Sequence, residues 1–227
     1  MNWLEILKSE MLEITKSAAY EFFPPIGTYT EPYYNLRFTH VKQVEIEALK
    51  LLKAHGGDRD IVLAAVWIHD RYKPVLYGPD HGNKAADWTL ENLESKGFPK
   101  EKVKAVEYAV RNHQGWDKTQ NPLETLEAKI LWDADKIAHR GPRFVFQTFM
   151  LFTSNILYGE EHNHNKEMEF NPTITLENIM PALLRLKREP DDGETELNPF
   201  HLEESLKIAD EKDEAANALI EALEKQL

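Results

Sequence analysis

Apolar residues recur at steps of three and four along most of this chain, which is the spacing of an amphipathic helix. The first such stripe consists of Trp3, Leu7, Met11, Ile14 and Ala18. The stretch from Phe22 to Tyr34 contains three prolines and a glycine, so an extended loop is expected there. No strand pattern and no internal repeat stands out. The pattern therefore predicts an all-α fold.

Helix starts and stops divide the rest of the chain. A second helix is expected from about Phe38 to the Gly56-Gly57 pair, a common type of helix end. Asp58 or Asp60 can cap the next helix, whose interior IVLAAVWI is almost wholly apolar and should be buried at the centre. Further helices are expected after Asp80 and Pro99, across 121–138, from 143, and across 175–188 and 199–227, with loops at 159–171 and 189–198. The last helix could dock on the body or pair with a second subunit.

Composition narrows the classes of protein. The 227 residues include no cysteine, so any bound metal must have nitrogen and oxygen ligands. The formal charge of −12 argues against a nucleic-acid polymer, whose phosphates require a basic face. The first twenty residues do not resemble a signal peptide, and no stretch approaches the ~20 apolar residues of a membrane span. A cytoplasmic enzyme or binding domain is the expectation, with no membrane partner.

Candidate chemistry begins with the doublet His69-Asp70 at the C-terminal end of the apolar helix. Helix carbonyl dipoles penalise a carboxylate at that position. An ionised Asp70 close to the core needs a compensating cation or a strong hydrogen-bond donor. A divalent metal held by both residues would supply the charge. A histidine and an aspartate that simply face water at a helix end are the ordinary alternative.

Two other residues favour the metal. His40 shares the inward stripe of its helix with Val44, and Asp135 lies at the edge of the apolar stripe of the helix across 121–138. The neighbouring Asp133 is expected beside Lys136 on a solvated face, where ion pairs contribute little. Asp135 is thus the better ligand candidate of the two aspartates.

In this order, His40, His69-Asp70 and Asp135 resemble the motifs of the HD-domain metal-dependent phosphohydrolase superfamily. The segment IVLAAVWIHDRYKP is similar to the family's apolar helix ending in His-Asp, and EAKILWDADKI is similar to its last motif. The resemblance runs from about Arg37 to Gly141. It implies a single-domain helical bundle with additional C-terminal helices. Its expected parts are an N-terminal helix and proline-rich loop at 1–35, an HD-type metal-binding core at 36–141, and helices completing the same domain at 142–227.

The resemblance also implies a metal-dependent phosphohydrolase. The four ligands would hold one Mn, Fe, Co, Ni or Zn ion, with a water and a phosphoryl oxygen in the open positions. In metal-rich branches of the superfamily two further histidines supply a second metal. His81 and His113, the latter in the run NHQGWD, could do so here, or could contact substrate instead.

Charge that builds on the phosphoryl oxygens needs positive partners. Arg37 and Lys73 are the best placed in sequence, and Asp80 or Glu127 could orient the attacking water. The acidic balance makes a small phosphorylated substrate, a nucleotide above all, more plausible than a polymer. His139 has no motif behind it. His162 and His164 fall in the polar loop at 159–171, where a solvated role is expected.

Two other functions fit part of the pattern. Some HD-type bundles hold two irons and activate oxygen, which would require His81 and His113 as ligands. A non-catalytic module could instead bind a nucleotide and signal through the C-terminal helix. Four intact ligand candidates argue against a degenerate sensor.

Overall fold

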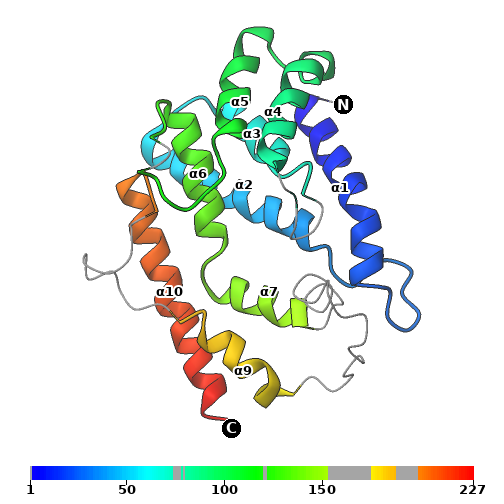
Figure 1. Cartoon of the computed structure of the whole chain (residues 1–227), viewed down its shortest axis with the longest axis vertical. Helices are drawn as coiled ribbons and strands as arrows, with labels where there is room; N and C mark the ends of the chain where they lie inside the picture. The colour runs from blue at the N-terminus through cyan, green and yellow to red at the C-terminus, as the bar shows by residue number, and fades with distance from the viewer. Residues whose placement is uncertain (1, 74–77, 79, 120–121, 153–174, 188–198) are drawn as a thin grey trace.

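The computed structural model describes residues 2–73, 78, 80–119, 122–152, 175–187 and 199–227. These residues form helices joined by loops, and no strand occurs among them (Figure 1). The all-α fold expected from the sequence is confirmed. Within the same ranges, every helix is too short or too polar to span a bilayer.

Helix α3 (Arg59–Ile68) lies at the centre of the larger part of the molecule, and all its residues from Ile61 to Ile68 are buried. Asp58 caps it, because the Asp58 carboxylate accepts hydrogen bonds from the N–H groups of Asp60 and Ile61. The helices that contact α3 are α1 (Trp3–Phe22), α2 (Leu36–His55), α5 (Val103–Arg111) and α6 (Leu126–Ala138). Helix α4 (His81–Asn92) packs on α5, and two short 3₁₀ turns (Glu94–Lys96 and Lys100–Lys102) join them. The uninterrupted apolar run from Ile61 to Ile68 explains why α3 is surrounded by other helices.

A second, smaller apolar cluster joins the C-terminal helices α7 (Pro142–Phe152), α9 (Leu176–Leu184) and α10 (Glu203–Glu224). Its buried members are Val145, Ile179, Met180, Leu183, Ala216 and Ile220. Helix α10 also contacts α6 and α2, and Figure 1 shows it (orange to red) beside α9. The last helix therefore docks on the body of its own chain. Its pairing with a second subunit stays a prediction.

Helix α6 begins later than the pattern across 121–138 predicts. Its first residue is Leu126, and Thr125 is the N-cap, whose hydroxyl accepts a hydrogen bond from the N–H of Ala128 at 3.2 Å. The N–H of Glu124 donates instead to the Tyr108 hydroxyl at 3.0 Å. Residue 121, the loop predicted at 159–171 with His162 and His164, and the turn at 189–198 lie outside the described residues.

The solvated face predicted for Asp133 and Lys136 is wrong. Both side chains are buried, and the Asp133 carboxylate accepts hydrogen bonds from the N–H groups of His201 and Leu202 at 2.9 and 2.8 Å. These two residues come just before α10, so the start of that helix covers Asp133. Asp133 acts as a cap for a segment almost seventy residues further along the chain.

Candidate metal centre

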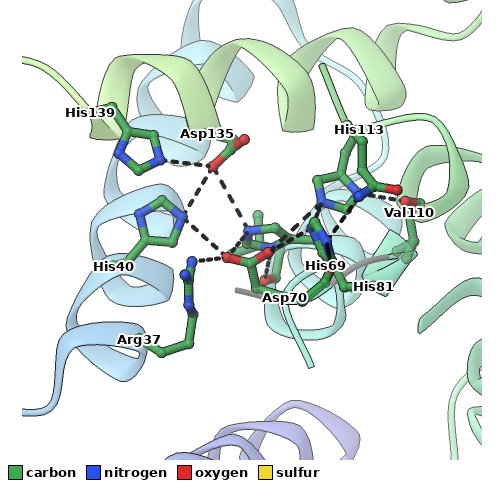
Figure 2. Close-up of polar contacts among 12 residues, drawn as sticks. Arg37, His40, His69, Asp70, His81, Val110, His113, Asp135 and His139 are labelled. Atoms are coloured by element: carbon green, nitrogen blue, oxygen red, sulfur yellow. Dashed lines mark hydrogen bonds and ion pairs between the residues drawn. The ribbon is translucent and has the colours of Figure 1, made fainter. Parts of the chain in front are cut away.

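Five segments of the chain bring histidines and aspartates to one point (Figure 2). The second turn of α2 supplies His40, and the end of α3 supplies His69 and Asp70. The remaining side chains come from the first residue of α4, from the loop just after α5, and from the last turns of α6: His81, His113, Asp135 and His139. The structure therefore gathers all six ligand candidates considered from the sequence.

Six of these residues form two groups, each with its ligand atoms within 4.8 Å of one another. The first group is His40, His69 and Asp135. His40 Nε2 lies 3.0 Å from Asp135 Oδ1, and His69 Nε2 lies 4.0 Å from the same oxygen. Such spacings suit atoms that surround one ion at bond lengths of about 2.0–2.2 Å.

The second group is Asp70, His81 and His113. His81 Nε2 lies 3.2 Å from Asp70 Oδ1, and His113 Nε2 lies 3.9 Å from it. Asp70 Oδ2 points the other way, 3.6 Å from His40 Nε2 and 3.5 Å from His69 Nε2. Asp70 thus presents one carboxylate oxygen to each group (Figure 2).

Backbone carbonyls orient three of the histidine rings. The Nδ1 atoms of His69, His81 and His113 lie 2.8, 2.7 and 2.6 Å from the carbonyl oxygens of Val66, Gly78 and Val110. A carbonyl only accepts, so an Nδ1 atom in such a contact carries the hydrogen and donates it. His81 Nδ1 also lies 2.9 Å from the side-chain amide nitrogen of Gln114, and the shorter contact to the Gly78 carbonyl assigns its hydrogen. A neutral ring protonated at Nδ1 has its lone pair on Nε2. This second contact of the ring is the usual way in which proteins orient a metal-binding histidine.

The Nε2 lone pairs of these histidines face one another, and few hydrogen-bond donors lie between them. His81 Nε2 and His113 Nε2 are 3.2 Å apart, although both are acceptors in this tautomer. The Nε2 atoms of His40 and His69 are buried and have no hydrogen-bond partner in the described part of the chain. Acceptors that face one another beside two carboxylates need a cation. The imidazole and carboxylate donors fit a divalent transition metal.

Electrostatics keep both carboxylates charged. Burial raises the pKa of Asp70, but the Arg37 guanidinium and the His69 ring outweigh it and hold that pKa well below its usual range. Burial likewise opposes ionisation of Asp135, and Lys136 with His40 holds the pKa of Asp135 well below its usual range. Burial lowers the pKa of His69 to about 3. The centre therefore combines ionised carboxylates with a neutral His69 ring at neutral pH, the protonation states that metal ligands need.

Arg37 and Lys136 are cations in direct contact with these carboxylates. Arg37 is buried and donates to Asp70 Oδ2 (Figure 2). Lys136 Nζ donates to Asp135 Oδ2 at 2.9 Å and to the carbonyl oxygen of His113 at 2.8 Å. Lys136 thereby links Asp135 of the first group to His113 of the second.

Sequence reasoning gave His139 no role, but the structure places it in the centre. Its ring stacks on His40 with the ring centroids 4.7 Å apart, and its Nε2 lies 3.8 Å from Asp135 Oδ1. Position 139 is four residues after Asp135 and hence on the same face of α6. That spacing was the signal in the sequence that could have identified it.

Three residues predicted to act in catalysis lie apart from the two groups. Glu127 Oε1 accepts a hydrogen bond from the N–H of Asp58 at 2.9 Å, at the opposite end of α6 from Asp135. Asp80 is exposed, in the left-handed region at φ 59°, and accepts from Asn83 Nδ2 at 2.5 Å. Lys73 is half-buried, and its N–H donates to the carbonyl oxygen of Asp70 at 3.0 Å. The structure therefore gives Glu127 a capping contact and leaves Lys73 beside the doublet.

The comparisons with known proteins agree with this helical bundle and its His/Asp centre. Residues 37–140 match the family model of the HD domain, and this match confirms the resemblance noted in the sequence. No curated protein matches the chain in a sequence comparison.

Several solved structures share the fold. The Lin1889 protein of Listeria innocua is 25% identical, with 100% of this chain and 97% of that chain covered and a TM-score of 0.51. A predicted HD superfamily hydrolase from an uncultured Thermotogales bacterium is 19% identical, with coverage of 100% and 99% and a TM-score of 0.56. Bacillus subtilis YpgQ in complex with ADP is 14% identical, with coverage of 99% and 95% and a TM-score of 0.55. The described part of the chain thus shares its fold with these structures.

Proposed function

We propose that this protein is a metal-dependent phosphohydrolase that acts on a small phosphorylated substrate, a nucleotide above all. The observation that carries the proposal is the pair of His/Asp groups that share Asp70. HD domains bind divalent metals, and each group offers the nitrogen and oxygen donors that such ions take. The complex of Bacillus subtilis YpgQ with ADP supports a nucleotide as substrate.

The sequence predicts one ion and leaves a second open. We propose two, since His81 and His113 complete a group of their own with Asp70. His40, His69 and Asp135 would hold one ion, and His81 and His113 the other, with a carboxylate oxygen of Asp70 on each side. Bound metal supplies a water of lowered pKa and polarises the phosphoryl group.

The side chains around the centre have separate tasks in this proposal. Backbone carbonyls fix the rings of His69, His81 and His113, so that their lone pairs already face the ligand positions. Arg37 holds Asp70 Oδ2 and keeps the shared carboxylate oriented. Arg37 is therefore a positioning residue more than a phosphate partner. Lys73, on the turn after the doublet, remains the cation proposed to receive the phosphoryl oxygens.

The test is release of phosphate and pyrophosphate from a panel of nucleotides with added Mn²⁺. Wild type is compared with Asp70→Ala and with a control, Asp210→Ala, on the exposed side of α10. We expect Asp70→Ala to lower turnover by about 10³-fold or more, since it removes a ligand from both groups. The control should keep wild-type turnover. Equal turnover in wild type and Asp70→Ala would reject this site, and no turnover on the whole panel would reject the nucleotide.

An iron-dependent oxygenase is the second candidate. Its specific support is that His81 and His113 do lie with Asp70, as that chemistry requires. Iron-loaded protein would then absorb visible light and consume oxygen with an organic substrate, while releasing no phosphate from nucleotides. A non-catalytic module would retain a nucleotide without turnover in the same panel.

A further inference from the structure

One tryptophan differs from the other four in its exposure. Trp67 and Trp132 are buried, and Trp3 and Trp88 are half-buried against Phe98 and Arg71. Trp116 is 52% exposed. A half-exposed indole does not gain the free energy that full burial would provide. Large aromatic side chains exposed in this way are typical of binding surfaces.

The local backbone holds Trp116 outward. Gly115 has φ 104°, a region that side chains rarely adopt. A Cβ at Gly115 would also meet the buried Trp132 ring at 3.4 Å. The backbone at Gly115 therefore packs against the Trp132 ring, and the side chain of Trp116 points away from the core. The close approach of Gly115 to Trp132 of α6 thus sets where the Trp116 side chain begins, and a contact whose position is set by the fold suits a preformed binding surface.

The neighbours of Trp116 place it at the edge of the metal centre. Its ring centroid is 5.9 Å from that of His139, and the His139 ring stacks on His40. The Lys136 ammonium lies 5.6 Å from the Trp116 centroid and donates to Asp135. Trp116 is thus one side chain away from the first His/Asp group and partly open to solvent.

We propose that Trp116 stacks on the aromatic base of the nucleotide whose phosphates reach the metal centre. The proposal rests on the proposed function, and it adds the residue that would favour a nucleotide over a base-free phosphate compound. Stacking on an indole tolerates any base, since every base has a π-face. Trp116 would therefore distinguish nucleotides from pyrophosphate without selecting one base.

Calorimetry on the Mn²⁺-loaded protein with two matched probes tests this. The first probe is α,β-methylene-ADP, and the second is methylenediphosphonate, which has the same phosphonate bridge without the nucleoside. We expect Trp116→Ala to weaken binding of the first probe on the order of tenfold and to leave the second unchanged. Trp116→Phe keeps a stacking face and should stay within about threefold of wild type. Quenching of tryptophan fluorescence by the first probe should be lost in Trp116→Phe.

A control variant is Tyr29→Ala, which removes a 78% exposed aromatic residue from the loop between α1 and α2. It should bind both probes as wild type does. Unchanged binding of the nucleotide probe to Trp116→Ala would overturn the proposal and leave the proposed function intact, as would equal weakening for both probes. A wild-type protein that binds methylenediphosphonate but not the nucleotide probe would instead reject the nucleotide itself. Trp116→Leu replaces Trp116→Ala if the latter does not fold.

Discussion

Asp133 and Asp135 stand two residues apart on α6, and their surroundings differ in kind. Asp133 is fully buried, and its two oxygens accept hydrogen bonds from the backbone N–H groups of His201 and Leu202. Asp135 faces the other way, with one oxygen on Lys136 and the other beside the rings of His40, His69 and His139. The oxygens of Asp133 accept hydrogen bonds from the chain's own backbone, whereas Asp135 has three histidine rings beside one of its oxygens.

Burial alone does not separate a structural carboxylate from a metal ligand. What separates them is the balance of donors and acceptors around the group. Each oxygen of Asp133 accepts a hydrogen bond from a backbone N–H donor, so its surroundings do not call for a metal ion. Around Asp135 and Asp70, lone pairs of several histidines converge, and only a cation balances them. This imbalance is the strongest structural argument for the metal.

The largest expected effect concerns metal binding itself. Mn²⁺ at a thousand times its dissociation constant should stabilise the chelator-treated protein by about 4 kcal/mol. For a chain of this size that is a rise in melting temperature of roughly 8–16 °C. Asp70→Asn should lose most of this rise, and Asp133→Asn should keep it. Thermal unfolding with and without Mn²⁺ measures the difference.

The two variants make this test specific. Both replace a buried aspartate by its isosteric amide, so a general effect of removing a buried charge would appear in both. Equal Mn²⁺-dependent rises in Asp70→Asn and Asp133→Asn would mean that the ion binds elsewhere, and the contrast between the two aspartates would fail.

The pKa values of Asp133 and Asp135 also differ. Burial raises the pKa of Asp133 to about 6, in the opposite direction from that of Asp135. Because the folded-state pKa exceeds the unfolded value of 3.8, folded protein binds more protons between about pH 4 and pH 6. The stability that Asp133 contributes is thus fully present below pH 4 and is lost as the pH rises through 6. In chelator-treated protein, the free energy of unfolding of wild type relative to Asp133→Asn should fall by about 2–3 kcal/mol between pH 4 and pH 7.

Denaturant unfolding at the two pH values measures this difference. Asp210→Asn, which changes an exposed aspartate of α10, is the control and should track wild type. A constant difference between wild type and Asp133→Asn across this pH range would mean that the two N–H donors outweigh burial at Asp133.

The sequence predicted the centre as far as short-range patterns reach. Each of His40, His69-Asp70 and Asp135 stands on an apolar stripe or at its end, and their order resembles one family. Asp133 and Lys136 were predicted to face solvent, because helical periodicity cannot reveal that the start of α10 covers Asp133. Nor can it reveal that the ammonium of Lys136 reaches Asp135 and the carbonyl oxygen of His113. His139 was missed for a simpler reason: its spacing from Asp135 was visible, but it belongs to no motif.

Helix boundaries, too, could be predicted where they depend on neighbouring residues. The sequence offered Asp58 or Asp60 as the cap of α3 and the Gly56-Gly57 pair as the end of α2, and the structure has Asp58 and Gly56 in these roles. The start of α6 was predicted four or five residues too early, because the N–H of Glu124 bonds to Tyr108 of another helix. Helix caps that depend on neighbouring residues could be predicted from the sequence, and contacts between distant segments could not.

The smallest expected effect concerns Glu127, which the sequence offered as an acid that could orient the attacking water. Glu127 and Asp135 share a stripe, but eight residues of α6 separate them by about 12 Å along its axis. Glu127 Oε1 accepts from the N–H of Asp58 at the start of α3 instead. Glu127→Ala should therefore cost about 1 kcal/mol of stability and leave the turnover number within about twofold of wild type. Denaturant unfolding and the nucleotide assay measure the two quantities, and a loss of turnover of tenfold or more at unchanged stability would return Glu127 to the reaction.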